Sequence, residues 1–120
     1  LKVVSEKWST HEWLHFLKHL PESLNLDQME DLDKVFNLSN SGNSEIVAVW
    51  FLQSIKNDYR PAFENLEKFL LKIGRRKFLQ PIYLELSKNK EQKIWAKKVY
   101  QKARNNYHYV SFNTIDNILN

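Results

Sequence analysis

Residues that stop a helix are scarce in this chain, and this scarcity constrains the fold more than any other feature. The 120 residues include two Gly and three Pro, which leaves few positions for the many turns of a β-sandwich or β-barrel. Apolar residues make up 42% of the chain and aromatic residues 13%, enough for the core of one ordinary domain. Long helices around an apolar core are therefore the expected architecture.

Apolar residues recur at helical spacing in six segments, each bounded by a cap, a turn or a proline. The segments cover about residues 10–20, 26–36, 44–56, 61–73, 77–86 and 91–105. Their starts pair them into three antiparallel hairpins that repeat at roughly 33–35 residues, a length typical of stacked helical repeats. We predict a single all-α domain over residues 1–120, an armadillo- or HEAT-like α-α superhelix of about six helices in three antiparallel pairs.

The same spacing assigns residues to inward and outward faces. Leu26 and Val35 fall on the inward face of the second segment, whereas Asp33 falls on its outward face. Residues 46–52 are hydrophobic on nearly every face, so we expect this part of the third segment to be the buried centre. Residues 107–120 alternate loosely between apolar and polar, and we expect this tail to pack back on the helices.

Residues 11–15 read His-Glu-Trp-Leu-His, the pattern in which two imidazoles one helical turn apart bind zinc and the glutamate acts as a general base. A catalytic zinc needs a third protein ligand, and His19 lies two turns from the first histidine, roughly 12 Å along the axis. Where gluzincin peptidases have the glutamate that supplies this ligand, Lys34 stands here. Glu12 also completes a capping box with Ser9. We therefore predict a helix start here and no metal ligand or catalytic residue in this chain.

Residues 74–81 break a local rule of helix formation. Gly74 ends one helical segment as a residue able to take a positive φ, and three consecutive cations follow at residues 75–77, where the next segment begins. Cations at a helix start face the positive end of the helix dipole, at a cost of roughly 0.3–1 kcal/mol each when exposed. A bound anion compensates, so we predict an anion site here. Pro81 is tolerable only in the first turn of a helix, which favours a start near Leu79.

Charge is distributed unevenly along the chain. The net charge is +4, but residues 1–60 carry 6 basic and 9 acidic residues, whereas residues 61–120 carry 12 basic and 5 acidic residues. Such asymmetry fits either a nucleic-acid surface or a solvated basic face, and the sequence favours the solvated face. The basic residues of the last helical segment are Lys93, Lys97, Lys98, Lys102 and Arg104.

Cysteine is absent from the chain, which leaves out disulfides and thiolate metal sites and fits a reducing compartment. No apolar run approaches the roughly 18 residues of a membrane span and no leader pattern is present, so we expect no membrane partner. The chain opens at Leu1 without an initiator methionine, and we expect it to be a piece of a longer polypeptide or a processed product.

Three short motifs occur in order along the chain. They are Ser9-Thr10-His11, then Asn43-Ser44-Glu45-Ile46 with Trp50, then Gly74, Arg75, Lys77, Phe78 and Pro81 with Tyr83. In this order and spacing they resemble the C-terminal helical domain of the zinc aminopeptidases that include leukotriene hydrolase, aminopeptidase B and aminopeptidase O. The resemblance implies an α-α superhelix beside a separate thermolysin-like catalytic domain that carries the zinc motif and is not in this chain.

The resemblance also implies roles for two cations. In this family the arginine and lysine of the Gly-Arg-x-Lys-Phe motif bind the carboxylate of the substrate, and they match Arg75 and Lys77; Arg76 stands where leukotriene hydrolase has an apolar residue. The implied function is that of an accessory domain of a zinc metalloaminopeptidase that removes N-terminal residues from short peptides. Its partners would be the catalytic domain, which holds the zinc, and a short peptide. We expect a cytoplasmic monomer, with the nucleus or nucleolus as the alternative location.

Two other classes of function stay open from the residues alone. One is a helical-repeat scaffold that binds a protein or nucleic acid through the basic face of residues 93–104, although the sequence does not favour nucleic acid. The other is a self-contained zinc hydrolase at residues 11–15, which the missing third ligand disfavours.

Overall fold

The computed structural model describes residues 8–21 and 24–119, so Leu1 and Asn120 lie outside the described part. Within that part, seven α-helices follow one another without a strand, which confirms the all-α fold class. The helices are α2 (Thr10–Lys18), α3 (Leu26–Phe36), α4 (Ser44–Lys56), α5 (Phe63–Lys72), α6 (Arg76–Ser87), α7 (Lys90–Ala103) and α8 (Tyr109–Leu119). Short 3-10 helices η1 (Leu38–Asn40), η2 (Arg60–Ala62) and η3 (Arg104–Asn106) lie between them.

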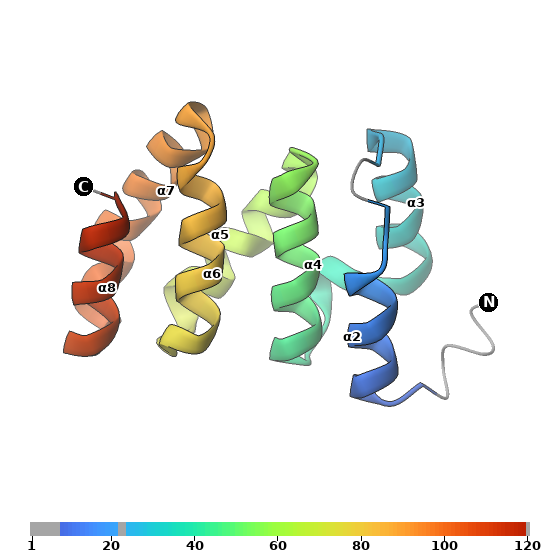
Figure 1. Ribbon diagram of the computed structural model, residues 1–120, viewed down its shortest axis with the longest axis horizontal. Coiled ribbons are helices and arrows are strands. Elements are labelled where there is room, and N and C mark those ends of the chain that lie inside the picture. Colours follow the sequence, from blue (N-terminus) through green and yellow to red (C-terminus); the bar gives the residue numbers. More distant parts are fainter. Residues whose placement is uncertain (1–7, 22–23, 120) are drawn as a thin grey trace. The chain divides into compact units, whose positions relative to one another are not determined.

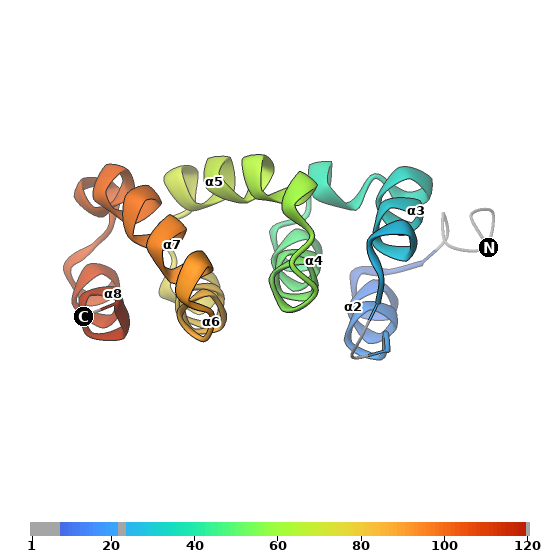
Figure 2. The ribbon, with the colours of Figure 1, turned by 90° about the horizontal axis from the view of Figure 1, so that it is seen from above.

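The chain divides into two compact units, Leu1–Ala62 and Phe63–Asn120. In the first unit α2 and α4 run parallel and side by side, and α3 lies in a second layer (Figures 1 and 2). In the second unit α6 and α8 run side by side in one layer, with α5 and α7 in the other. Each unit therefore has the alternating two-layer arrangement of an α-α superhelix.

The tail forms a helix of its own, which the sequence pattern did not specify. Helix α8 packs against α6 (Figure 1), as expected for a segment that returns to the other helices. Its buried residues are Ser111, Ile115 and Leu119, which are spaced four apart and so lie on one helical face. Tyr109 and Val110, at the start of the helix, are exposed.

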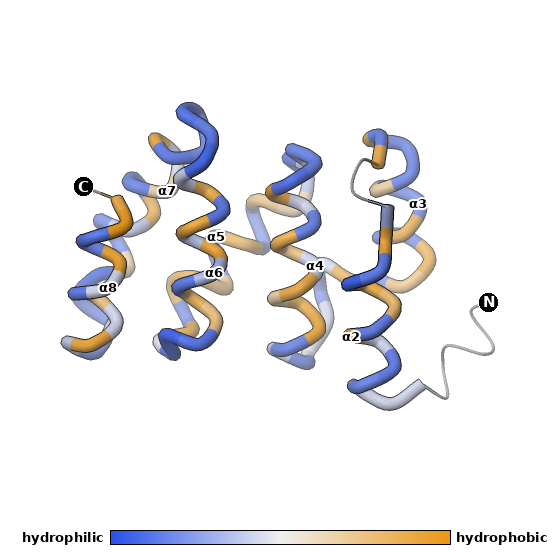
Figure 3. The backbone as a smooth tube through the Cα atoms, in the orientation of Figure 1, coloured by the Kyte–Doolittle hydropathy of each residue, from blue (hydrophilic) through white to orange (hydrophobic). Residues whose placement is uncertain are grey.

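Helix α4 is the core of the first unit. Ile46, Val47, Ala48, Trp50 and Phe51 are all buried, which confirms the prediction that this helix is the buried centre. The hydropathy of the other helices is mixed, with hydrophobic positions interleaved with hydrophilic ones along each (Figure 3). Their burial is one-sided, as expected for amphipathic helices that cover a core.

The face predicted for α3 was partly wrong. Leu26 is 57% exposed and Val35 is 46% exposed, and Met29 is the residue that α3 buries fully. Asp33, predicted to face outward, accepts hydrogen bonds from the backbone N–H of Ser39 at 2.8 Å and from its Oγ at 2.7 Å. Helical periodicity alone missed this because a carboxylate can turn inward wherever buried donors meet it.

The Asp33 carboxylate connects three segments of the first unit. The Tyr59 hydroxyl donates to it at 3.2 Å, and the indole Nε1 of Trp50 donates to the Ser39 Oγ at 2.9 Å. Burial first, and then the negative charge of Asp33, raise the pKa of Tyr59 to about 12. The only Trp side chain of α4 is thus tied through Ser39 to a carboxylate on α3.

None of the helices in the described residues combines the length and the apolarity that crossing a bilayer requires.

Replacing Asp33 with Ala should destabilise the chain by about 2 kcal/mol, because it removes a charged acceptor and leaves the donors of Ser39 and Tyr59 without it. Urea denaturation of the purified chain measures this change. Asp31→Ala, an exposed residue of the same helix, is the matched control and should cost about 0.5 kcal/mol or less. Equal losses for the two variants would contradict the structural role of Asp33.

Candidate functional site

Helix α6 lacks the side-chain cap that four other helices have at their first turn. Side-chain oxygens of Ser9, Asn25, Asn43 and Asn89 accept from first-turn N–H groups of α2, α3, α4 and α7. At α6 the N-cap residue is Arg75, and its side chain makes no capping hydrogen bond. A guanidinium has no acceptor to offer. The start of α6 is therefore rich in donors and positive charge, as predicted for residues 74–81.

Two details of this junction differ from the prediction. Gly74 does not have a positive φ, so α5 ends without a left-handed glycine cap. Helix α6 starts at Arg76 rather than near Leu79, and Pro81 is its sixth residue and lies beyond the first turn. The helix continues through Pro81 because buried side chains on both sides of it, including Leu79 and Ile82, hold the segment against the core despite one lost backbone hydrogen bond.

An open depression of about 520 Å³ lies at the start of α6. Its lining residues come from the α5–α6 junction and from the beginning of α8, and they are Gly74, Arg75, Arg76, Lys77, His108, Val110 and Ser111. None of these lining residues is acidic. The structure therefore brings all three predicted cations to one concave surface. His108 and Ser111, which are distant from the cations in the sequence, line the same surface.

Arg75 and Lys77 both approach the ring of Phe78. The Arg75 Cζ lies 5.9 Å from the ring centroid and the Lys77 Nζ lies 5.4 Å from it, within the range of a cation–π contact. Phe78 is itself buried and meets Phe69 edge-on at 6.2 Å between centroids. The two cations thus share an aromatic support that is fixed to the core, while their charged groups stay exposed.

His108 and Ser111 were not identified from the sequence. They lie more than thirty residues from the cationic stretch, in a tail whose pattern indicated packing only. Only the packing of α8 on α6 brings them to the depression. No local motif carried this information.

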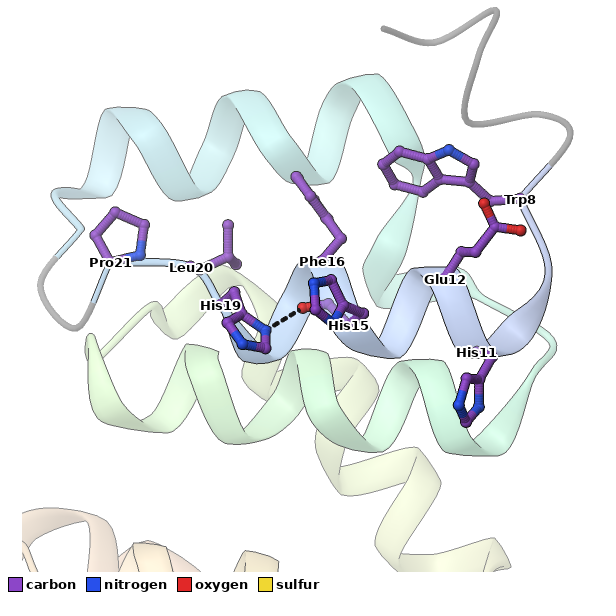
Figure 4. A pocket seen from close by; sticks show the side chains of 8 residues that line it. All are labelled: Trp8, His11, Glu12, His15, Phe16, His19, Leu20 and Pro21. Atoms are coloured by element: carbon purple, nitrogen blue, oxygen red, sulfur yellow. Dashed lines mark hydrogen bonds between the residues drawn. The ribbon is translucent and has the colours of Figure 1, made fainter.

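The histidine motif of α2 forms a helix start, as predicted (Figure 4). The Ser9 Oγ accepts from the Glu12 N–H at 3.3 Å, and the Ser9 N–H donates to Glu12 Oε1 at 3.2 Å. The rings of His15 and His19 stack at 4.2 Å, with the His19 Nδ1 2.8 Å from the His15 carbonyl oxygen. In residues 8–21 and 24–119, no group of three or more His, Asp or Glu side chains is arranged to hold a metal ion.

These histidines line an open depression of about 710 Å³ together with apolar side chains, among them Trp8, Phe16 and Leu20 (Figure 4). Glu12, the general base of a zinc peptidase motif, is here held by the backbone and side chain of Ser9. Its carboxylate serves the helix start, which is the role that the spacing from Ser9 predicted.

The basic face of the last segment is partly neutralised within the second unit. Lys102 lies 3.7 Å from Glu67, and Arg104 contacts Asp116 at 2.8 Å while its Cζ lies 4.3 Å from the Phe112 ring centroid. Hydrogen bonds from Arg104 and then from the Tyr100 hydroxyl lower the pKa of Asp116 to about 2. Two of the five predicted surface cations therefore bind carboxylates of the same unit.

The described residues form an all-helical fold with a cationic depression at the start of α6. The family model described as "Leukotriene A4 hydrolase, C-terminal" matches residues 8–119. The chain belongs to this family.

The chain is also similar in sequence to proteins named as aminopeptidases. The chain is 30% identical over 104 residues to leucine aminopeptidase 2 of Neurospora crassa, and the aligned region covers 84% of the chain and 15% of the relative. It is 25% identical over 121 residues to aminopeptidase B of Mus musculus, covering 98% of the chain and 19% of the relative. The chain thus spans less than a fifth of the length of these relatives. Within the family, the sequence led us to favour aminopeptidase O, and this finer assignment stays a prediction.

The purified chain should retain far less than one zinc ion per molecule after incubation with micromolar zinc and dialysis, because two histidines without a third ligand hold the ion weakly. Metal analysis by mass spectrometry measures the ratio. Near-stoichiometric zinc that is lost in the His15→Ala variant would contradict the interpretation of residues 11–15 as a helix start.

Proposed function

We propose that this chain is the accessory C-terminal domain of a larger zinc aminopeptidase that removes N-terminal residues from short peptides. In this proposal Arg75 and Lys77 bind the C-terminal carboxylate of the peptide. Family membership supports the domain assignment, and the aminopeptidase names of the relatives support the reaction class. The zinc would lie in the catalytic domain, where it activates a water and polarises the scissile carbonyl.

One observation supports the proposal that Arg75 and Lys77 bind a carboxylate. The depression at the start of α6 is lined by three cations and by no acidic residue. A carboxylate there meets the guanidinium of Arg75, which can bind it through two parallel N–H groups, and the ammonium of Lys77, which acts as a point charge. It also meets the positive end of the α6 dipole without competition from a side-chain cap.

The contribution of this site to the reaction is positional. Arg75 and Lys77 make and break no bond; they hold one end of the peptide so that the scissile bond stays in register with the catalytic groups, which lowers the entropic part of the barrier. The distance from the anchor to the zinc also limits substrate length, because a longer peptide cannot reach both at once. This proposal therefore predicts a preference for short peptides.

Arg76 lines the same depression as its two neighbours. We propose that Arg75 and Lys77 make the direct contacts, since both rest on the Phe78 ring, and that Arg76 adds to the positive potential. A charge that acts only through the potential should be more sensitive to salt than a direct hydrogen bond.

In the full-length enzyme, Arg75→Ala should lower kcat/KM for a tripeptide by about 100-fold, because a charge-assisted hydrogen bond to the carboxylate contributes about 2–3 kcal/mol. The C-terminal amide of the same tripeptide lacks the negative charge and should lose about threefold or less. Steady-state kinetics on both substrates measures the difference. Equal losses on the two substrates would remove the carboxylate role.

The alternative function is a helical scaffold that binds a nucleic acid or protein through the basic face of residues 93–104. Lys102 and Arg104 already have partners within the unit, which leaves Lys93, Lys97 and Lys98 for such a surface and weakens it.

We expect the purified chain to show no salt-dependent association with a 20-nucleotide RNA in fluorescence anisotropy. Phosphate contacts predict affinity that falls steeply between about 50 and 200 mM salt. Binding with that salt dependence, reduced by Lys97→Ala and unchanged by Lys18→Ala, would favour the scaffold instead.

A further inference from the structure

The segment from Tyr107 to Ser111, which leads into α8, contacts the α5–α6 junction at two backbone carbonyl groups. The Tyr107 hydroxyl donates to the carbonyl oxygen of Leu70 at 2.6 Å, and the Ser111 Oγ donates to the carbonyl oxygen of Gly74 at 3.0 Å. Leu70 lies in the last turn of α5, where carbonyl groups lack partners within the helix, and Gly74 lies in the connector. One short segment thus holds the backbone on both sides of the point where α5 ends.

A third hydroxyl extends this contact into α6. The hydroxyl oxygens of Tyr83 and Tyr107 lie 3.1 Å apart. Because a carbonyl only accepts, the Tyr107 proton points to Leu70, and Tyr83 must then donate to the Tyr107 oxygen. Burial raises the pKa of Tyr107 to about 12 and raises that of Tyr83 as well, so both hydroxyls remain protonated donors. The chain of hydrogen bonds joins α6 to the end of α5.

The same segment supplies one wall of the cationic depression. Tyr107 and Ser111 are buried, with 6% and 4% of their surfaces exposed, and His108 and Val110, which lie between them, line the depression. The two hydrogen bonds therefore fix this wall against the junction that carries the cations. A displacement of the segment would change both the shape of the depression and the path of the backbone at Gly74.

The junction has little local structure of its own to fix that path. Gly74 is conformationally permissive, and a Cβ at this position would meet only the Asn106 carbonyl oxygen, at an ordinary 3.7 Å. The Arg75 side chain makes no capping hydrogen bond to α6, although the Arg75 carbonyl oxygen accepts from the N–H groups of Phe78 and Leu79 at 3.0 and 3.1 Å. These bonds fix Arg75 to α6, whereas on the α5 side the connector is held at Leu70 and Gly74 by the hydroxyls of Tyr107 and Ser111.

We propose that Tyr107 and Ser111, the anchor pair, are positioning residues for Arg75 and Lys77. By holding the carbonyls of Leu70 and Gly74, they set where the two cations stand relative to the substrate carboxylate, and both hydroxyl protons are directed to these carbonyls. This inference rests on the proposed carboxylate role of the cations.

Ser111→Ala in the full-length enzyme tests it. This change should lower kcat/KM for a tripeptide with a free carboxylate by about tenfold, as expected when a binding group is displaced by a fraction of an ångström. The C-terminal amide of the same peptide should change by about twofold or less, since the catalytic centre is untouched. Ser111→Thr, which keeps the hydroxyl, should restore the rate on the free carboxylate.

Two further variants separate positioning from general stability. Thr114→Ala removes another α8 hydroxyl, one that bonds to Val110 within the helix at 2.9 Å, and should leave the ratio of the two rates unchanged. In an Arg75→Ala, Lys77→Ala background, Ser111→Ala should have no selective effect left. If Ser111→Ala does not fold, Tyr107→Phe removes the other hydrogen bond while keeping the ring and should show the same selectivity.

The outcomes distinguish this inference from the proposed function. Equal losses on both substrates in Ser111→Ala, or a selective loss that persists without Arg75 and Lys77, would overturn the positioning role. If Arg75→Ala discriminates between the substrates and Ser111→Ala does not, the positioning role alone fails. If Arg75→Ala does not discriminate either, both the carboxylate role and the anchor pair are refuted.

Discussion

The first turn of every α-helix leaves N–H groups without backbone partners, and how each helix satisfies them shapes this molecule. Helices α2, α3, α4 and α7 use a serine or asparagine side chain for this purpose. Helix α6 presents Arg75 instead, followed by two more cations. A helix start that combines donors with positive charge favours an anion, and the proposed carboxylate site follows from this feature of α6.

The cations at the start of α6 can bind an anion well only if the backbone that carries them is held in place. Gly74 has no positive φ and the Arg75 side chain makes no capping hydrogen bond. Hydrogen bonds to the carbonyls of Leu70 and Gly74 come from Tyr107 and Ser111, more than thirty residues away. The second unit thus couples the packing of α8 on α6 to the position of a binding surface. Supporting contacts of this kind affect how well a binding group is oriented toward its ligand.

The local features could be predicted from the sequence and the long-range ones could not. The capping box at Ser9 and the bounds of α3 depend on residues within one or two turns, and the structure confirms them. The hydrogen bond from Tyr59 to Asp33 and the meeting of His108 and Ser111 with residues 74–77 depend on how distant segments pack. Pro81 shows the same limit, because its helix continues through it on the strength of buried neighbours.

The most direct test of the account is a crystal structure of the full-length enzyme with a non-hydrolysable tripeptide analogue bound. We predict that the C-terminal carboxylate of the peptide lies within hydrogen-bonding distance of the Arg75 guanidinium and the Lys77 ammonium. The hydrogen bond from Ser111 to the Gly74 carbonyl should still be present. A peptide whose carboxylate is bound by the catalytic domain, with Arg75 and Lys77 both in solvent, would contradict it.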